Sequence, residues 1–167
     1  MTKGPETDII AGVSVSHSHA TLDRIEGVAA RSEGEAVESI VDHTGVSEAF
    51  VLQTCNRAEA YVVSRDAETA HNALSTYLGD VNRDSVVELG HEDGLRHLMS
   101  VACGLESLVL GEDQILGQLR DAYETARGVG AIGPTLDDAL LKALHVGERA
   151  RSETAINEGA LSIGSAA

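Results

Sequence analysis

The chain has 167 residues, 43% of them hydrophobic, which allows one compact domain or two small units that share a core. Aromatic residues make up only 2%, so we expect a core of Leu, Val, Ile and Ala. The net charge of −15, with Lys3 and Lys142 as the only lysines, indicates a host with a salty cytoplasm, where an acidic surface keeps proteins dissolved. Because salt near 1 M shortens the reach of charge to about 3 Å, this acidity does not exclude nucleic acid as a partner.

The composition also bears on compartment and metal content. No apolar run approaches the roughly 20 residues of a membrane span, and the first residues lack a signal-peptide pattern, so we expect a cytoplasmic protein that does not enter a membrane. Cys55 and Cys103 are too few for a disulfide framework, and the apolar surroundings of Cys103 are typical of packing. His17 and His19 are the nearest approach to a metal-ligand pair. Without further Cys or His at ligand spacing, we expect no metal site.

The first ninety residues alternate between strands and helices. The patterns predict a strand at 8–15, helices at 21–31 and 33–42, strands at 49–53 and 59–64, a helix at 67–78 and a short strand at 85–89. This order favours an α+β fold with a small, largely antiparallel sheet packed with helices.

After Gly90 the pattern becomes all-helical. Helices are predicted at 91–102, at 113–127 and from Pro134 onward, and 113–127 has the clearest apolar stripe. Gln114 and Gln118, four residues apart, share a face beside that stripe. We expect a sheet-containing part at about 1–90 and a helical part at about 91–150, followed by a tail of small residues with no obvious stop.

A glycine-rich run at 128–133 matches the dinucleotide pattern G-x-G-x-x-G. That loop binds pyrophosphate only where it follows a buried strand and opens a helix. Here it follows a predicted helix and runs into Pro134. We therefore interpret it as a connection between two helices.

The segment FVLQTCNRAEAYVV at 50–63 places a cysteine beside an arginine between two predicted strands. A thiol attacks as its thiolate, and an unperturbed pKa of about 8.5 leaves little of it ionised at neutral pH. Arg57 could lie near the sulfur of Cys55 or bind a carboxylate with its planar fork. The local sequence leaves two interpretations open: a nucleophile beside its substrate-holding group, or a turn with an incidental cysteine.

Two longer motifs favour the nucleophile. TCNRAE at 54–59, followed by Tyr61, resembles the active-site motif of the glutamyl-tRNA reductase family, whose members begin five-carbon tetrapyrrole synthesis. HLMSVACGLESLVLGEDQILGQ at 97–118 resembles the second signature of that family, and 151–167 resembles the start of its long interdomain linker helix. The N-terminal segment departs from the family, which usually has His-Lys-Thr-Ala-Pro where this chain has HSHAT at 17–21.

The resemblance implies a mechanism and a set of site residues. Cys55 would attack the ester that joins glutamate to the tRNA 3′ end, and NADPH would reduce the resulting thioester to glutamate-1-semialdehyde. His97 matches the activity-critical histidine of the family and would polarise the carbonyl or protonate a leaving oxygen, although the residues alone favour a packed core histidine. Arg57 would hold oxygens of the substrate and Glu112 its α-ammonium. The implied substrate-binding positions are Thr54, Asn56, Arg57, Ser107, Glu112, Asp113, Gln114 and Gln118.

The resemblance also implies what surrounds this unit. Residues 1–150 would form the catalytic glutamate-recognition domain and 151–167 the truncated start of the linker helix. The NADPH-binding and dimerisation domains, through which the full-length protein would form a homodimer, would lie outside the chain, and the downstream aminomutase would be a further partner. Two alternatives remain: a cysteine-dependent acyl hydrolase or transferase that never uses NADPH, and a non-catalytic binding module that uses His17 and His19 with a metal.

Overall fold

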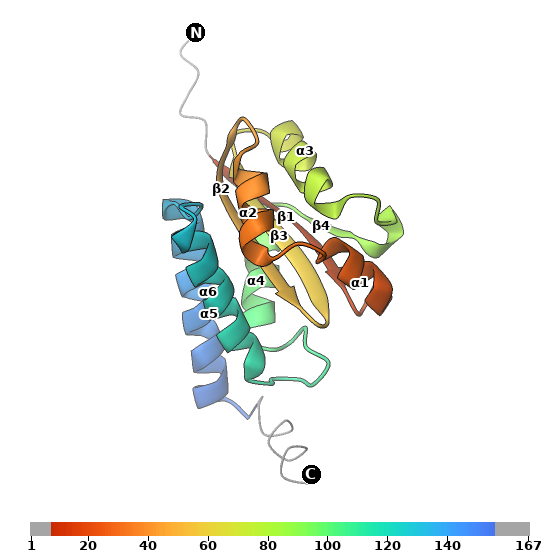
Figure 1. Ribbon diagram of the computed structural model, residues 1–167. Coiled ribbons are helices and arrows are strands. Elements are labelled where there is room, and N and C mark those ends of the chain that lie inside the picture. The colour runs from red at the N-terminus through yellow and green to blue at the C-terminus, as the bar shows by residue number, and fades with distance from the viewer. Residues whose placement is uncertain (1–7, 156–167) are drawn as a thin grey trace.

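The computed structural model describes residues 8–155, and its four strands form one antiparallel sheet in the order β2-β3-β1-β4 (Figure 1). The strands are β1 (Ile9–Ser16), β2 (Val46–Thr54), β3 (Arg57–Ser64) and β4 (Val87–Leu89). Every residue of β3 is buried, as expected for a strand inside a sheet that is covered on both faces. The predicted α+β fold with an antiparallel sheet is confirmed.

Helices cover both faces of this sheet. They are α1 (Leu22–Val28), α2 (Glu33–Val41), α3 (Ala67–Leu78), α4 (His91–Ala102), α5 (Gln114–Gly128) and α6 (Pro134–Glu153), with a 3₁₀ turn η1 (Arg83–Ser85). The first three pack on one face and α4 packs on the other, while the antiparallel pair α5 and α6 lies beside the outer strand β2 (Figure 1). Within residues 8–155, no helix is both long and apolar enough to cross a membrane.

The core is aliphatic, as the composition predicts, with all four aromatic side chains of the protein buried in it. Phe50 on β2 and Tyr61 on β3 are paired in register, and their ring centroids lie 6.0 Å apart. Gly12 is the partner of Tyr61 on β1, and a Cβ atom there would lie 2.8 Å from the tyrosine ring. Because Gly12 has no side chain, the Tyr61 ring can pack directly against the backbone of β1.

Several predicted boundaries shift in the structure. The helix expected at 21–31 ends at Val28, because Ser32 begins α2 by accepting a hydrogen bond from the Glu35 N–H at 3.2 Å. The paired strands extend inward to Thr54 and Arg57, so the polar segment between them shrinks to a two-residue turn. Residues 151–153 form the last turn of α6, and residues 156–167 of the expected linker helix lie outside the described residues.

The glycine-rich run joins α5 to α6, as expected of a helix-to-helix connection. The buried carboxylate of Glu48 on β2 occupies the N-terminus of α6, accepting hydrogen bonds from the backbone N–H groups of Gly133 (2.7 Å), Leu136 (2.8 Å) and Thr135 (3.3 Å). These are donors that a helix leaves unpaired, and the helix dipole favours a negative charge there. The protein's own carboxylate thus fills the position that a phosphate would need.

We expect Gly133→Ala to lower the free energy of unfolding by about 1–3 kcal/mol, because the added Cβ would lie 2.7 Å from the Glu48 carboxyl carbon and displace it from its three donors. Gly128→Ala in the same run meets no atom within 4 Å and should leave stability unchanged or raise it by up to about 1 kcal/mol. Urea unfolding of both variants measures the difference. Equal effects at the two positions would contradict the role given to Glu48.

Candidate active site

Cys55 and Asn56 form the turn between β2 and β3, and the Cys55 side chain is exposed. Neither residue has the positive φ of the turns that two-residue hairpins prefer, so contacts outside the turn must support it. The Asn56 N–H donates to Thr54 Oγ1 at 3.2 Å, and the Asn56 carbonyl accepts from the His17 N–H at 3.0 Å. The backbone of β1 and its extension thus braces a turn that presents the thiol to solvent.

A buried carboxylate, Glu59 on β3, lies behind this turn and is wholly inaccessible to solvent. Its Oε2 atom accepts from Ser14 Oγ at 2.5 Å, lies 2.6 Å from His97 Nε2 and accepts from Arg57 Nη1 at 3.3 Å. Its Oε1 atom accepts from the Tyr61 hydroxyl at 3.1 Å. We call these five residues the Glu59 network. It joins β3 to β1 and to α4 directly beside the Cys55 turn.

Glu59 is a functional candidate that is absent from the predicted site residues, although it lies in the TCNRAE motif. The signal was present, since alternation along a strand places Arg57, Glu59 and Tyr61 on one face. Three polar side chains on one face of an otherwise apolar strand indicate a buried polar cluster, because such groups are costly to bury without partners.

The network sets the charge of its members. Burial alone would raise the pKa of Glu59, but the hydrogen bond and charge of His97, together with Arg57 and Ser14, leave that pKa lowered. Burial alone would lower the pKa of His97, and the hydrogen bond and charge of Glu59 outweigh it, so the His97 pKa is raised above its ordinary 6.5. Each partner thus favours the charged form of the other, a carboxylate paired with an imidazolium.

The second motif reaches the same place through the loop between α4 and α5, residues 103–113, which we call the 103–113 loop. Arg57 Nη2 donates to the Glu106 carbonyl at 2.6 Å, so the buried guanidinium, with a side chain only 3% exposed, connects the network to the loop. Ser107, the next residue, is half-buried. In Figure 1 the loop lies below the tip of the β2–β3 hairpin.

In the second motif, two of the predicted substrate-binding residues have structural partners. The Glu112 carboxylate caps α5, accepting from the N–H groups of Gln114 at 3.0 Å and Ile115 at 3.1 Å. Asp113 lies 2.9 Å from Arg151 Nε on α6. The side chains of Ser107, Gln114 and Gln118, by contrast, form no hydrogen bond with any residue that the structure describes. Within the described part of the chain, those three side chains are thus available to a ligand.

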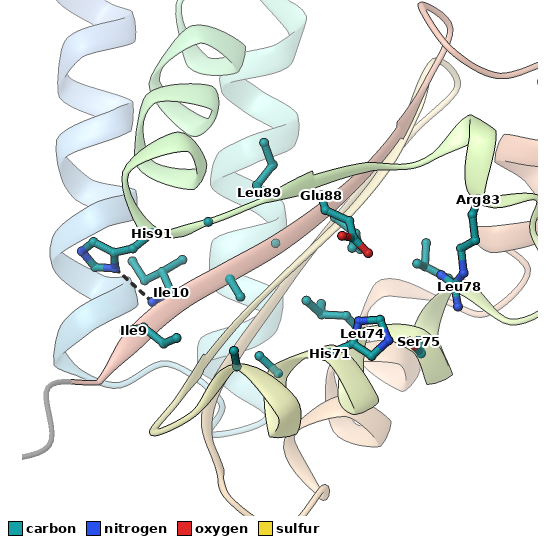
Figure 2. A pocket seen from close by; sticks show the side chains of 16 residues that line it. Ile9, Ile10, His71, Leu74, Ser75, Leu78, Arg83, Glu88, Leu89 and His91 are labelled. Atoms are coloured by element: carbon teal, nitrogen blue, oxygen red, sulfur yellow. Dashed lines mark hydrogen bonds between the residues drawn. The ribbon is translucent and has the colours of Figure 1, made fainter.

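A pocket of about 360 Å³ lies elsewhere, between α3, β1 and β4 (Figure 2). Its floor is apolar, and His71, Ser75 and Glu88 stand at its rim. None of the residues predicted to form the site lines it. Among residues 8–155 there is also no group of three His, Cys, Asp or Glu side chains placed to hold a metal ion. The predicted site residues that the structure describes therefore lie apart from this pocket.

Comparison with known proteins connects this geometry to a family. A family model described as "Glutamyl-tRNAGlu reductase, N-terminal domain" matches residues 13–154. The chain belongs to the glutamyl-tRNA reductase family. Curated glutamyl-tRNA reductases from Natronomonas pharaonis and Haloarcula marismortui are 68% and 60% identical over 97% of this chain and 36% of their own length. Both organisms are haloarchaea, in keeping with the acidic composition.

A solved structure supports the same assignment at the level of fold. Glutamyl-tRNA reductase from Methanopyrus kandleri matches 96% of this chain and 38% of its own chain, with 36% identity and a TM-score of 0.84. The present chain therefore spans about a third of the length of the family members it matches. The match at 13–154 contains all ten residues of the predicted site.

We expect Glu59→Gln to lower the pKa of His97, because burial then acts on the imidazolium without a compensating carboxylate. In the unsubstituted chain, the stability that this pairing contributes is fully present below pH 6.5 and is lost as the pH rises through the raised pKa of His97. In the variant, stability is lost in the opposite direction, as the pH falls through the lowered pKa of His97. A histidine NMR titration with urea unfolding on both sides of neutrality measures both effects. Glu48→Gln, which removes another buried carboxylate from the sheet, should leave the His97 titration unchanged.

Proposed function

We propose that this chain is the part of a glutamyl-tRNA reductase that accepts the glutamyl group, and that Cys55 forms a thioester with it. The observation that carries the proposal is an exposed thiol on a braced turn, directly next to a buried Arg57–Glu59–His97 cluster. A thiol with an incidental place in a turn has no need of a charged network behind it. The membership of the chain in the reductase family supports the same reaction.

The acyl transfer can be written with its atoms balanced. A bond forms between Cys55 Sγ and the glutamyl carbonyl carbon, and the ester bond from that carbon to the ribose oxygen breaks. His97, held as an imidazolium by Glu59, donates its proton to the leaving ribose oxygen and is restored by the proton that the thiol gives up. The net proton movement runs from thiol to ribose hydroxyl. Water can later hydrolyse the thioester to glutamate and the free thiol.

We propose that the glutamyl side of the substrate lies against the 103–113 loop and the first turns of α5. Ser107, Gln114 and Gln118 have side chains there that form no hydrogen bond among residues 8–155, and Thr54 and Asn56 flank the thiol. Arg57 uses two of its five N–H groups on Glu59 and the Glu106 carbonyl, which leaves three N–H groups for oxygens of the substrate. Glu112 and Asp113 would act mainly by shaping the start of α5.

The residues described here do not fit a dinucleotide. The glycine-rich run follows a helix, and the helix N-terminus after it already binds Glu48. We therefore assign NADPH binding, and with it the reduction, to the part of the longer family members that this chain does not match. Contacts of a homodimer and of an aminomutase partner belong to the same assignment. No step proposed for residues 1–167 uses NADPH.

We expect the 167-residue chain, mixed with radiolabelled glutamyl-tRNA, to yield a glutamyl adduct on the peptide that contains Cys55, followed by slow release of glutamate. Peptide mass spectrometry after acid quench locates the adduct. Cys55→Ser should abolish the adduct and the release of glutamate, because an alcohol is a far weaker nucleophile than a thiol at neutral pH.

Cys103→Ser is the matched control, since Cys103 is buried at the end of α4 and should not react. Adduct formation that survives Cys55→Ser, or that never occurs in the unsubstituted chain, would refute the proposed function. Loss of all activity on treatment with a chelator would favour the metal-dependent binding module instead.

A further inference from the structure

Arg151, in the last turn of α6, holds a set of contacts that the proposed reaction does not use. Its side chain is only 7% exposed. The guanidinium donates to the carbonyls of Ala102 at 2.6 Å, Gly147 at 3.0 Å and Glu112 at 2.5 Å. Its Nε atom lies 2.9 Å from Asp113 Oδ1, a charge contact rather than an aligned hydrogen bond, because Nε–H finds no hydrogen-bond acceptor among the described residues.

These contacts hold together the two ends of the 103–113 loop. Ala102 is the last residue of α4, where unpaired carbonyls favour a cation, and Glu112 is the next-to-last residue of the loop, just before α5. Between them the chain crosses itself at two glycines with positive φ, Gly104 (76°) and Gly111 (73°), joined by a 3.0 Å hydrogen bond. A Cβ on Gly104 would lie 2.7 Å from Gly111 Cα and 3.1 Å from Arg151 Nη2. The guanidinium thus closes the base of the loop.

The crossing of α6 over α4 brings Arg151 to this position. At Gly147 a Cβ atom would lie 2.6 Å from the Ala102 carbonyl oxygen, so only glycine permits the two helices to approach this closely. Arg151 follows one helical turn later, on the same face of α6. It therefore reaches past the end of α4 to the loop that Arg57 holds from the other side through Glu106.

We propose that Arg151 is a positioning residue that sets the shape of the 103–113 loop, and through it the selectivity of Cys55 for a glutamyl group. The inference rests on the proposed function, because the loop carries Ser107 and leads into Gln114, the free polar groups assigned to glutamate. Arg151 touches neither the thiol nor the substrate. Its loss should therefore impair recognition while leaving the thiol itself as reactive as before.

The test compares two readouts on the Cys55 peptide of the 167-residue chain. The first is single-turnover acylation by glutamyl-tRNA and by the same tRNA charged with glutamine. The second is alkylation by iodoacetamide, which does not use the loop. Arg151→Met should slow glutamyl transfer roughly 10–100-fold and reduce the preference for glutamyl over glutaminyl tRNA, because small misplacements of a binding group have effects of that size. The alkylation rate should stay within about twofold of the unsubstituted chain.

Arg149→Met is the matched control, since Arg149 lies in the same helical turn but pairs with Glu153 at the surface. It should leave every rate unchanged. Arg151→Lys keeps the positive charge but loses the planar guanidinium, and should reduce the preference for glutamyl over glutaminyl tRNA to a smaller degree. If Arg151→Met does not fold, Arg151→Lys alone provides the test.

Two results distinguish the inference from the function beneath it. Unaltered glutamyl preference in a folded Arg151 variant, or a parallel loss of acylation and alkylation, would overturn the role of Arg151 while the thioester chemistry stands. No adduct in the unsubstituted chain would instead overturn the proposed function, and this inference with it.

Discussion

The burial of the Glu59 charge is the constraint on which the rest of the site depends. A carboxylate removed from water costs several kcal/mol unless charged partners and hydrogen bonds replace its hydration. Four side chains do so here, from β1, β3 and α4. Because one oxygen is shared by Arg57 and His97, the position of each depends on the other. The carboxylate thereby fixes both the proton on His97 and the direction of the Arg57 guanidinium.

Arg57 and Arg151 both fix the position of the 103–113 loop. Each is almost fully buried and donates to main-chain carbonyls of the same loop, at Glu106 and at Glu112. The exposed ion pairs of this acidic chain, such as Arg120 with Glu148, are screened in strong salt and contribute little there. Buried guanidinium-to-carbonyl bonds keep their strength under the same conditions. A protein with a net charge of −15 can therefore keep its site rigid with a few sequestered arginines.

Local pattern predicted most of the elements, and its failures have a common cause. The helices at 67–78 and 91–102 agree residue for residue with the structure, because apolar period and helix-start signals are local. The partners of Glu48 and Glu59 lie 38 to 88 residues away along the chain, apart from neighbours on the same strand, and no local spacing reveals them. Glu112 differs, since its helix-cap partners lie only two and three residues away, and its predicted role toward a ligand stays a prediction.

The division of labour at the hairpin explains how one thiol can be both accessible and controlled. The glutamyl group of the proposed substrate arrives on the end of a large carrier, so its ester can reach a sulfur only at a surface. The pocket beside α3 is lined by none of the predicted site residues and contains no cysteine. At the hairpin tip, Cys55 is exposed, while the groups proposed to orient and protonate the substrate are the buried Arg57 on β3 and the part-buried His97 on α4. Exposure of the sulfur and burial of its charged supports are thus two parts of one arrangement, because a charge network at the surface would be hydrated and screened.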